Sequence, residues 1–207
     1  MLLQLSQDHF EIWSEQQSKH EYRMTRAVWF ILQVLLMQTV SARNNEMYMT
    51  VAFGGTTGTA YDDSKIIGPG QIVHSVTIRS GERVNGVGVD TTTLSGTRSN
   101  LYHGGGGGKE TTLTLNSGEY VTNMEIHVGA KEGSTRVVFV KFTTSSGRSI
   151  SGGTPTSDVY NLKTESGFQL GGFFGASGKE LDSIGPVWTR ITPSLEEPGT
   201  VNPDPYY

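Results

Sequence analysis

Apolar and polar residues alternate with a period of two through the middle of the chain. An example is QIVHSVTIRS, residues 71–80. Its even positions hold Ile72, His74, Val76 and Ile78, and its odd positions hold Val73, Ser75, Thr77 and Arg79. VTNMEIHV (121–128) and RVVFVKFTTSS (136–146) continue the pattern. Such segments, separated by turn residues, predict short β-strands. No segment after Ala42 has a helical period, so we predict an all-β domain over residues 48–191.

The N-terminal region has a different pattern. Residues 26–42 combine a basic flank, an apolar stretch at 27–36 and a small-residue end, Val40-Ser41-Ala42. This order is typical of a secretory signal peptide, and the apolar stretch is short for a membrane span. We therefore assign residues 1–42 to an N-terminal extension with a signal peptide. Met24 is our hypothesis for the true start, and a helix packed on the domain or a signal anchor stays an alternative.

Glycine marks the same domain boundaries. There is none before Gly54, and 26 of the 27 glycines lie between Gly54 and Gly185. After the domain, residues 192–207 hold four of the seven prolines and are predicted to be a disordered tail.

Two sequence features recur within the domain. Ser-Gly begins SGERVNGVGV at Ser80, SGEYVTNMEI at Ser117 and SGKELDSIGPV at Ser177, and glycine-rich segments occur at 54–55, 104–108 and 152–153. We interpret the Ser-Gly copies as equivalent hairpin turns of three similar sheets. The third copy alone has an acid four residues after its glycine, Asp182, where the others have Asn85 and Thr122.

Composition excludes several functions. The formal net charge is −4 with a pI near 5.7, and the bases are scattered, so nucleic-acid binding is not expected. The chain has no cysteine, which excludes disulfides, thiol catalysis and cysteine-ligated zinc.

The sequence also lacks complete catalytic or cofactor-binding motifs. The HGGGGGKET segment at 103–111 lacks the first glycine and the Ser/Thr of a phosphate-binding loop. Asp62 and Asp63 are adjacent, so on a strand they point to opposite faces, and we favour a buttressing role. The histidines show no metal-ligand spacing, and no G-x-S-x-G elbow occurs. We expect no enzyme activity, metal or cofactor.

Four segments in order resemble jacalin-related lectins, over roughly Val51–Ile191. They are GGTTGTAYDD (54–63), LYHGGGGG (101–108), VVFVKFTTSSGRSISGG (137–153) and GFFGASGKELDSIGPVW (172–188). The resemblance implies a β-prism, in which three four-stranded antiparallel sheets surround a pseudo-three-fold axis. It also identifies Gly178-Lys179-Glu180-Leu181-Asp182 with the G-x-x-x-D sugar-binding signature of the family.

The resemblance further implies how sugar is held. Gly58, Lys179 and Glu180 would donate from their backbone N–H groups, and the Asp182 carboxylate, which we expect on an exposed loop, would accept from sugar hydroxyls. A second site would involve the first repeat and its glycine run, but Asn85 replaces the expected acid there. The residues of that second candidate are Gly81, Glu82, Arg83, Asn85, Gly104 and Gly105.

The sequence thus predicts a secreted lectin. A continuous single chain resembles the mannose/glucose-type members, so the expected partners are oligosaccharides of that type or a cell-wall polysaccharide. Neither nucleic acid nor a membrane span of the mature protein is expected, and homo-oligomerisation is left open. The alternative is a β-prism interaction or targeting module that has lost sugar binding. Nothing supplies the paired carboxylates of a glycoside hydrolase.

Overall fold

The computed structural model describes residues 46–131 and 133–191, and this part of the chain is all-β as expected. It contains thirteen strands and one turn of 3-10 helix, η1 (Asp63–Lys65). No helix of these residues is long and apolar enough to cross a membrane. The signal peptide within 1–42, the Met24 start and the tail at 192–207 lie outside the described residues.

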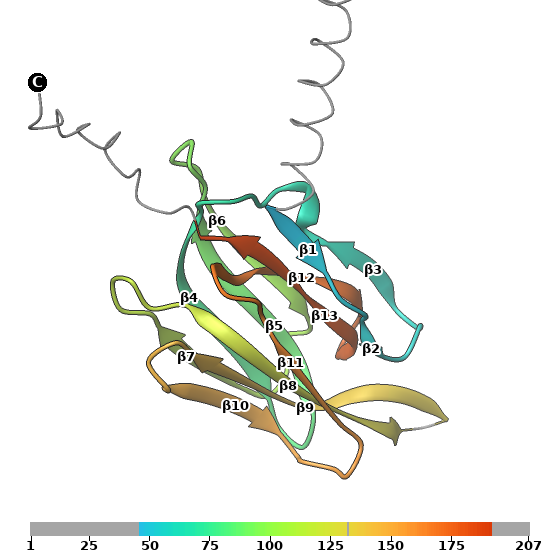
Figure 1. The fold of residues 1–207 in the computed structure, drawn as a ribbon. Coiled ribbons are helices and arrows are strands. Elements are labelled where there is room, and N and C mark those ends of the chain that lie inside the picture. Colours follow the sequence, from blue (N-terminus) through green and yellow to red (C-terminus); the bar gives the residue numbers. More distant parts are fainter. Residues whose placement is uncertain (1–45, 132, 192–207) are drawn as a thin grey trace, which may run out of the picture. The chain divides into compact units, whose positions relative to one another are not determined.

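The strands form three antiparallel sheets (Figure 1). The first sheet holds β4 (Ile72–Ser80), β5 (Val84–Thr92), β6 (Arg98–Gly104) and β7 (Lys109–Thr114). The second holds β8 (Val121–Lys131), β9 (Ser134–Thr144), β10 (Ser149–Gly153) and β11 (Val159–Lys163). The third joins β12 (Phe168–Ser177) and β13 (Leu181–Arg190) to the N-terminal β1 (Met47–Met49), β2 (Phe53–Gly54) and β3 (Thr59–Asp62).

All three sheets share one strand order. The orders are β6-β5-β4-β7 and β10-β9-β8-β11, so in each the third, second, first and fourth strands lie side by side. The third sheet repeats this order if β12 and β13 count as its first two strands, because β1 and β2 pair in succession with β13 and β3 pairs with β12. The third repeat therefore begins at the C-terminal side of the domain and is completed by its N-terminal strands. This arrangement confirms the predicted β-prism.

The core lies between the three sheets and takes side chains from each. The largest fully buried side chains include Ile78 from the first sheet, Phe142 from the second, and Phe173 and Trp188 from the third. Fully burying an aliphatic or aromatic side chain contributes about 1.5–3 kcal/mol.

The strand pattern at β4 differs from simple alternation. Val73, Val76 and Ile78 are buried, whereas Ile72 is 60% exposed. The pairing of β4 with β5 shifts between Val73 and Ser75, which leaves His74 as the extra residue of a β-bulge. Because a bulge reverses the faces on either side of it, Ile72 and Val76 point to opposite faces despite their even spacing.

The glycine-rich segments occupy one equivalent place in each sheet, between its third and fourth strands. Gly54, Gly104 and Gly153 each end a third strand with positive φ, at 128°, 115° and 93°. A Cβ on any of them would lie about 2 Å from the carbonyl oxygen of a neighbouring strand, so only glycine fits. The expected glycine repeat is therefore present in the fold.

The predicted equivalence of the three Ser-Gly turns is only partly correct. Ser80-Gly81 joins β4 to β5 and Ser177-Gly178 joins β12 to β13, so these two turns are equivalent. Ser117-Gly118 instead joins β7 to β8, at the opposite end of the strands. The third equivalent turn is the β8–β9 hairpin. Ser-Gly suits a tight turn at either end of a sheet, so the dipeptide alone does not fix its place.

Candidate functional site

Asp182 is the extra residue of a β-bulge near the start of β13. Ser177 pairs with Leu181 and Ala176 pairs with Ser183, which leaves Asp182 without an opposite residue. The same shift leaves Asn85 extra in β5 and Val138 extra in β9. Bulges re-aim the side chain that they contain. The fold thus has three equivalent bulges, which we call corners. Their side chains are the carboxylate of Asp182, the amide of Asn85 and the apolar group of Val138.

Each corner is closed by the same backbone hydrogen bond. The N–H of Gly55 donates to the carbonyl of Asp182 at 2.8 Å, and that of Gly105 donates to Asn85 at 2.9 Å. At the third corner Thr154 donates to Val138, also at 2.9 Å. The glycine-rich loop is therefore held against the bulge in every repeat, so the chemical differences between the corners come from side chains.

The Asp182 carboxylate is buried and anchored through one oxygen. The residue is 4% exposed, so our expectation that it stands on an exposed loop is wrong: the bulge turns it inward under the 54–58 loop. The hydroxyl of Thr57 donates to Oδ1 at 2.6 Å, and the guanidinium of Arg136 forms an ion pair with the same oxygen. Arg136 also donates to the Thr57 hydroxyl. These contacts join the second sheet to the third.

Asp182 also lines a pocket of about 280 Å³, where its other carboxylate oxygen, Oδ2, lies beside Gly58 and Gly178. Thr57, Gly58, Arg136, Asp182 and residues 178–180 line it. Gly58 has φ +90°, and a Cβ on it would lie 2.5 Å from Oδ2 of Asp182. Glycine at position 58 therefore keeps the space beside Oδ2 open.

The predicted signature residues take different places around this pocket. Gly178 donates its N–H to the Glu180 carbonyl at 2.9 Å, which closes the hairpin, and Gly81 makes the equivalent bond to Arg83 at 3.0 Å. Lys179 is exposed at the rim. Leu181 is fully buried in the core, so it positions Asp182 and does not line the pocket.

The second candidate corner is built differently. Gly107 and Gly108 cover the Asn85 side chain: a Cβ on them would lie 2.9 Å from its amide nitrogen and 2.7 Å from its amide oxygen. Gly108 has φ +71° and is the counterpart of Gly58, while Gly107 stands where Thr57 stands. Glycine supplies no hydroxyl to replace that of Thr57.

Two residues of the second candidate, Arg83 and Gly105, contact the hairpin of the Asp182 corner. Arg83 forms an ion pair with the Glu180 carboxylate, which ties the β4–β5 hairpin to the β12–β13 hairpin. A Cβ on Gly105 would lie 2.2 Å from the Lys179 carbonyl oxygen, so the loop packs directly on that hairpin. Gly81 and the exposed Glu82 lie in the β4–β5 turn.

A buried polar cluster supports the third sheet behind the pocket. The Asp63 carboxylate accepts the Phe173 N–H at 2.9 Å and lies 2.8 Å from Nε2 of His103. Tyr61 stacks on His103 with ring centroids 3.9 Å apart. Burial, with Asp63 and Asp182 nearby, raises the pKa of Tyr61, so its hydroxyl stays protonated and donates to the Ser183 carbonyl at 2.9 Å. The buttressing interpretation of Asp63 fits these contacts.

Three residues of the corners were missed from the sequence. Thr57 and Gly108 could have been found by aligning GGTTG at 54–58 with GGGGG at 104–108, because both loops have the same length. Arg136 gives no local signal, since only the approach of β9 to the third sheet brings it near Asp182. Among the described residues, no group of His, Asp and Glu could hold a metal ion.

Known proteins match this chain over the same region. A family model described as the jacalin-like lectin domain matches residues 50–187. The chain is 25% identical over 159 residues to Secreted RxLR effector protein 19 of Plasmopara viticola, which covers 75% of this chain and 88% of that protein. It is 34% identical over 116 residues to Horcolin of Hordeum vulgare subsp. vulgare, covering 54% of this chain and 77% of Horcolin.

Solved structures agree with the family model. The wild-type Malaysian banana lectin has a TM-score of 0.62 at 25% identity, covering 69% of this chain and 98% of that chain. A lectin of Ananas comosus, described as a mannose-binding jacalin-related lectin, shares the fold with a TM-score of 0.62 at 20% identity, covering 70% of this chain and 98% of that chain. Lectins bind carbohydrate without transforming it, which confirms the expectation of a non-enzymatic binding protein. The chain belongs to the jacalin-like lectin family.

Proposed function

We propose that this protein binds glycans of the mannose/glucose type in the pocket beside Asp182. The observation that carries the proposal is that the two carboxylate oxygens of Asp182 have different surroundings. Thr57 and Arg136 hold Oδ1, whereas Oδ2 faces Gly58 in the pocket. A fixed, ionised carboxylate is a strong acceptor for hydroxyl donors.

Backbone donors complete the proposed site. The N–H groups of Gly58, Lys179 and Glu180 would donate to sugar oxygens, and the closed hairpin at 178–180 limits the entropy lost on binding. Few groups and a shallow pocket predict a dissociation constant of roughly micromolar to millimolar, or about −8 to −4 kcal/mol. Useful avidity then requires several sites, supplied by a homo-oligomer or a repetitive polysaccharide.

Mannose is the first sugar to test. The Ananas comosus lectin is described as mannose-binding, but its identity of 20% supports the shared fold alone. The choice for this chain therefore rests on the continuous single chain, which resembles the mannose/glucose-type members. Glucose-type oligosaccharides and cell-wall polysaccharides belong in the same trial.

The Asn85 corner is proposed to contribute little binding. Asn85 carries no charge, and the glycines that cover it provide no counterpart of the Thr57 hydroxyl. Titration of the Asn85→Ala variant should leave the affinity for mannotriose unchanged.

Secretion is part of the proposal. The apolar stretch at 27–36 followed by Val40-Ser41-Ala42 supports it, and a relative is described as a secreted effector. N-terminal sequencing of the secreted product should read from Arg43. A product that begins at Met1 would contradict both the signal peptide and the Met24 start.

A second candidate function follows from the same relative. A protein described as an effector could use the β-prism to bind a host protein without sugar. An array of mannose, glucose and polysaccharide probes with no bound member, together with a partner recovered by pull-down, would favour this module over the lectin.

The proposal is tested by the Asp182→Asn variant, which keeps the shape of the side chain and removes its charge. Affinity for mannotriose should fall at least about tenfold, or 1.4 kcal/mol. Equal affinity for the wild-type and variant proteins would exclude the Asp182 pocket as the binding site.

A further inference from the structure

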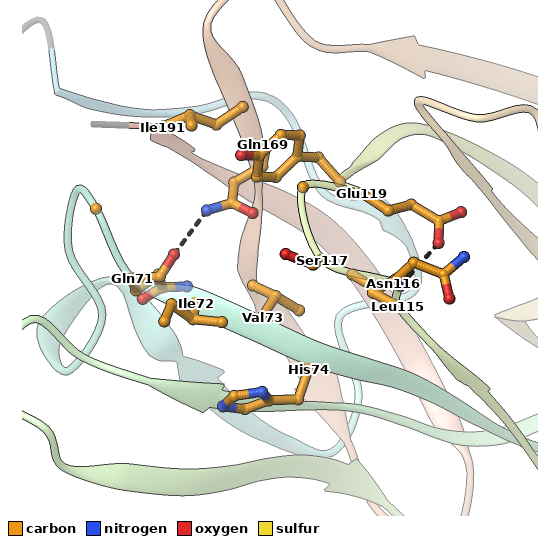
Figure 2. Close-up of a pocket in the computed structure, with 13 residues that line it drawn as sticks. Gln71, Ile72, Val73, His74, Leu115, Asn116, Ser117, Glu119, Gln169 and Ile191 are labelled. Carbon is orange, nitrogen blue, oxygen red and sulfur yellow. Dashed lines mark hydrogen bonds between the residues drawn. The ribbon is translucent and has the colours of Figure 1, made fainter. Parts of the chain in front are cut away.

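A larger pocket lies at the opposite end of the strands. It has a volume of about 470 Å³ and is bounded by the start of β4, the β7–β8 turn and Gln169 (Figure 2). β12 runs from Gln169 at this pocket to Ser177 at the Asp182 pocket. At about 3.3 Å per residue the two pockets are roughly 25 Å apart along that strand. We call it the distal pocket.

Gln169 supplies a buried and oriented acceptor to the distal pocket. The residue is 2% exposed, and its amide nitrogen donates to the Gln71 carbonyl at 2.8 Å. That bond fixes which end of the amide is oxygen, and Figure 2 shows the oxygen turned toward Ser117. Within residues 46–131 and 133–191, no hydrogen bond to this oxygen is present. The oxygen is not among the buried side-chain atoms that lack a partner, so it is accessible from the pocket, and water or a ligand hydroxyl is free to donate to it.

Gln71 holds the backbone around this acceptor. Its side-chain nitrogen donates to the Gly171 carbonyl at 2.7 Å, and its side-chain oxygen accepts the Gly68 N–H at 3.2 Å. The carbonyl that anchors Gln169 is therefore itself fixed on both sides. The acceptor is pre-positioned, which lowers the entropic cost of binding.

The distal pocket carries no unbalanced charge among the described residues. Neither lysine nor arginine lines it, and its titratable side chains with a histidine or carboxyl group are His74, whose Nε2 lies 2.8 Å from the Thr92 hydroxyl, and Glu119. Glu119 accepts from the Asn116 N–H at 2.9 Å, seen in Figure 2, from Arg148 at 2.7 Å, and from the hydroxyls of Thr144 and Ser146. These donors occupy both carboxylate oxygens. A charged ligand would therefore find no lysine or arginine here, and the only carboxylate is already bonded, whereas an uncharged ligand needs neither.

Apolar and polar groups face each other across the distal pocket. Ile72 and Val73 lie along one wall, while Ser117 and Tyr120 come from the β7–β8 turn. An apolar surface beside hydroxyl and amide groups matches a sugar ring, which has C–H faces and hydroxyl edges. An aromatic ring such as that of Tyr120 adds apolar area together with a polar hydroxyl.

We propose that the distal pocket is a second binding site, for an uncharged saccharide whose hydroxyl donates to the amide oxygen of Gln169. The site does not depend on Asp182. A chain with pockets at both ends can bridge two glycan strands, which raises avidity without a second copy of the protein.

The test combines variants that close each pocket. Asp182→Asn weakens the first, and Ser117→Arg places a long side chain over the mouth of the distal pocket from an exposed turn residue. Ser95→Arg is the matched control, an exposed serine in the β5–β6 loop at the same end. Each full-length protein is applied to an array of uncharged oligosaccharides, and thermal unfolding verifies the fold.

The proposal expects D182N to bind at least one array member, D182N/S117R to bind that member much more weakly, and D182N/S95R to match D182N. It is overturned if D182N binds nothing, or if D182N/S117R keeps what D182N binds. Binding that S117R alone removes and D182N leaves intact supports the distal pocket while refuting the proposed Asp182 site. A wild-type protein that binds no member refutes both.

Discussion

The guanidinium of Arg136 on β9 and the carboxylate of Asp182 on β13 form an ion pair across two sheets. The side chains are 22% and 5% exposed, so the pair lies at the floor of the pocket. Because Arg136 holds one carboxylate oxygen, it sets the direction of the other. A residue of the second repeat therefore positions the proposed ligand of the third.

Arg136→Gln should weaken mannotriose binding about tenfold. It should also lower the free energy of unfolding by about 1–3 kcal/mol, because a buried acceptor loses its charged donor. Arg136→Lys keeps a positive charge but lacks the planar guanidinium, so its affinity and its stability should lie between those of the wild-type protein and R136Q. Isothermal titration and chemical denaturation measure both effects. Unchanged affinity in R136Q would mean that the ion pair does not orient the binding oxygen.

Gly58→Ala should abolish binding in the Asp182 pocket, since its methyl group would enter the space beside Oδ2 of Asp182. Gly108→Ala is the matched control: it has the same left-handed strain, at φ +71°, and a similar clash at the Asn85 corner. Both variants should lose a similar amount of stability, about 1–3 kcal/mol. Only G58A should lose glycan binding. Equal loss of binding in both would point to a general effect of loop strain.

Glu119 links stability to acid pH. Hydrogen bonds from Ser146 and Thr144, together with the Asn116 N–H, lower its pKa from 4.5 to about 2. A lowered folded-state pKa contributes stability that is full above the unfolded pKa and is lost as the pH falls through the folded value. Glu119→Gln should therefore be less stable at pH 7, and its thermal midpoint should fall less between pH 4.5 and 2. Parallel curves for the two proteins would contradict this role.

The adjacent pair Asp62 and Asp63 should respond differently to removal. Asp63→Ala leaves the buried Phe173 N–H and His103 without their acceptor, at a cost of about 1–3 kcal/mol. Asp62 caps η1 by accepting the Ser64 N–H and is partly exposed, so Asp62→Ala should cost only about 1 kcal/mol. Urea denaturation compares them. A larger loss in D62A would refute the buttressing role of Asp63.

Local sequence patterns were sufficient to predict the fold. Alternation predicts strands because side chains alternate across a sheet, and the glycines at 54, 104 and 153 are required by close backbone approach. Asp182 was identifiable because the signature places an acid beside a turn glycine. Its burial was not, since a bulge depends on how two strands pair. The misplacement of Ser117-Gly118 has the same origin, because a turn motif does not say which end of a sheet it closes.

The most direct test is a calorimetric titration of mannotriose into the wild-type protein and the Asp182→Asn variant, with circular dichroism to verify the fold. The Asp182 pocket predicts saturable binding to the wild-type protein. It also predicts an affinity at least about tenfold lower for the folded variant. Identical dissociation constants for the two proteins, or no binding by the wild-type protein, would contradict glycan recognition through Asp182.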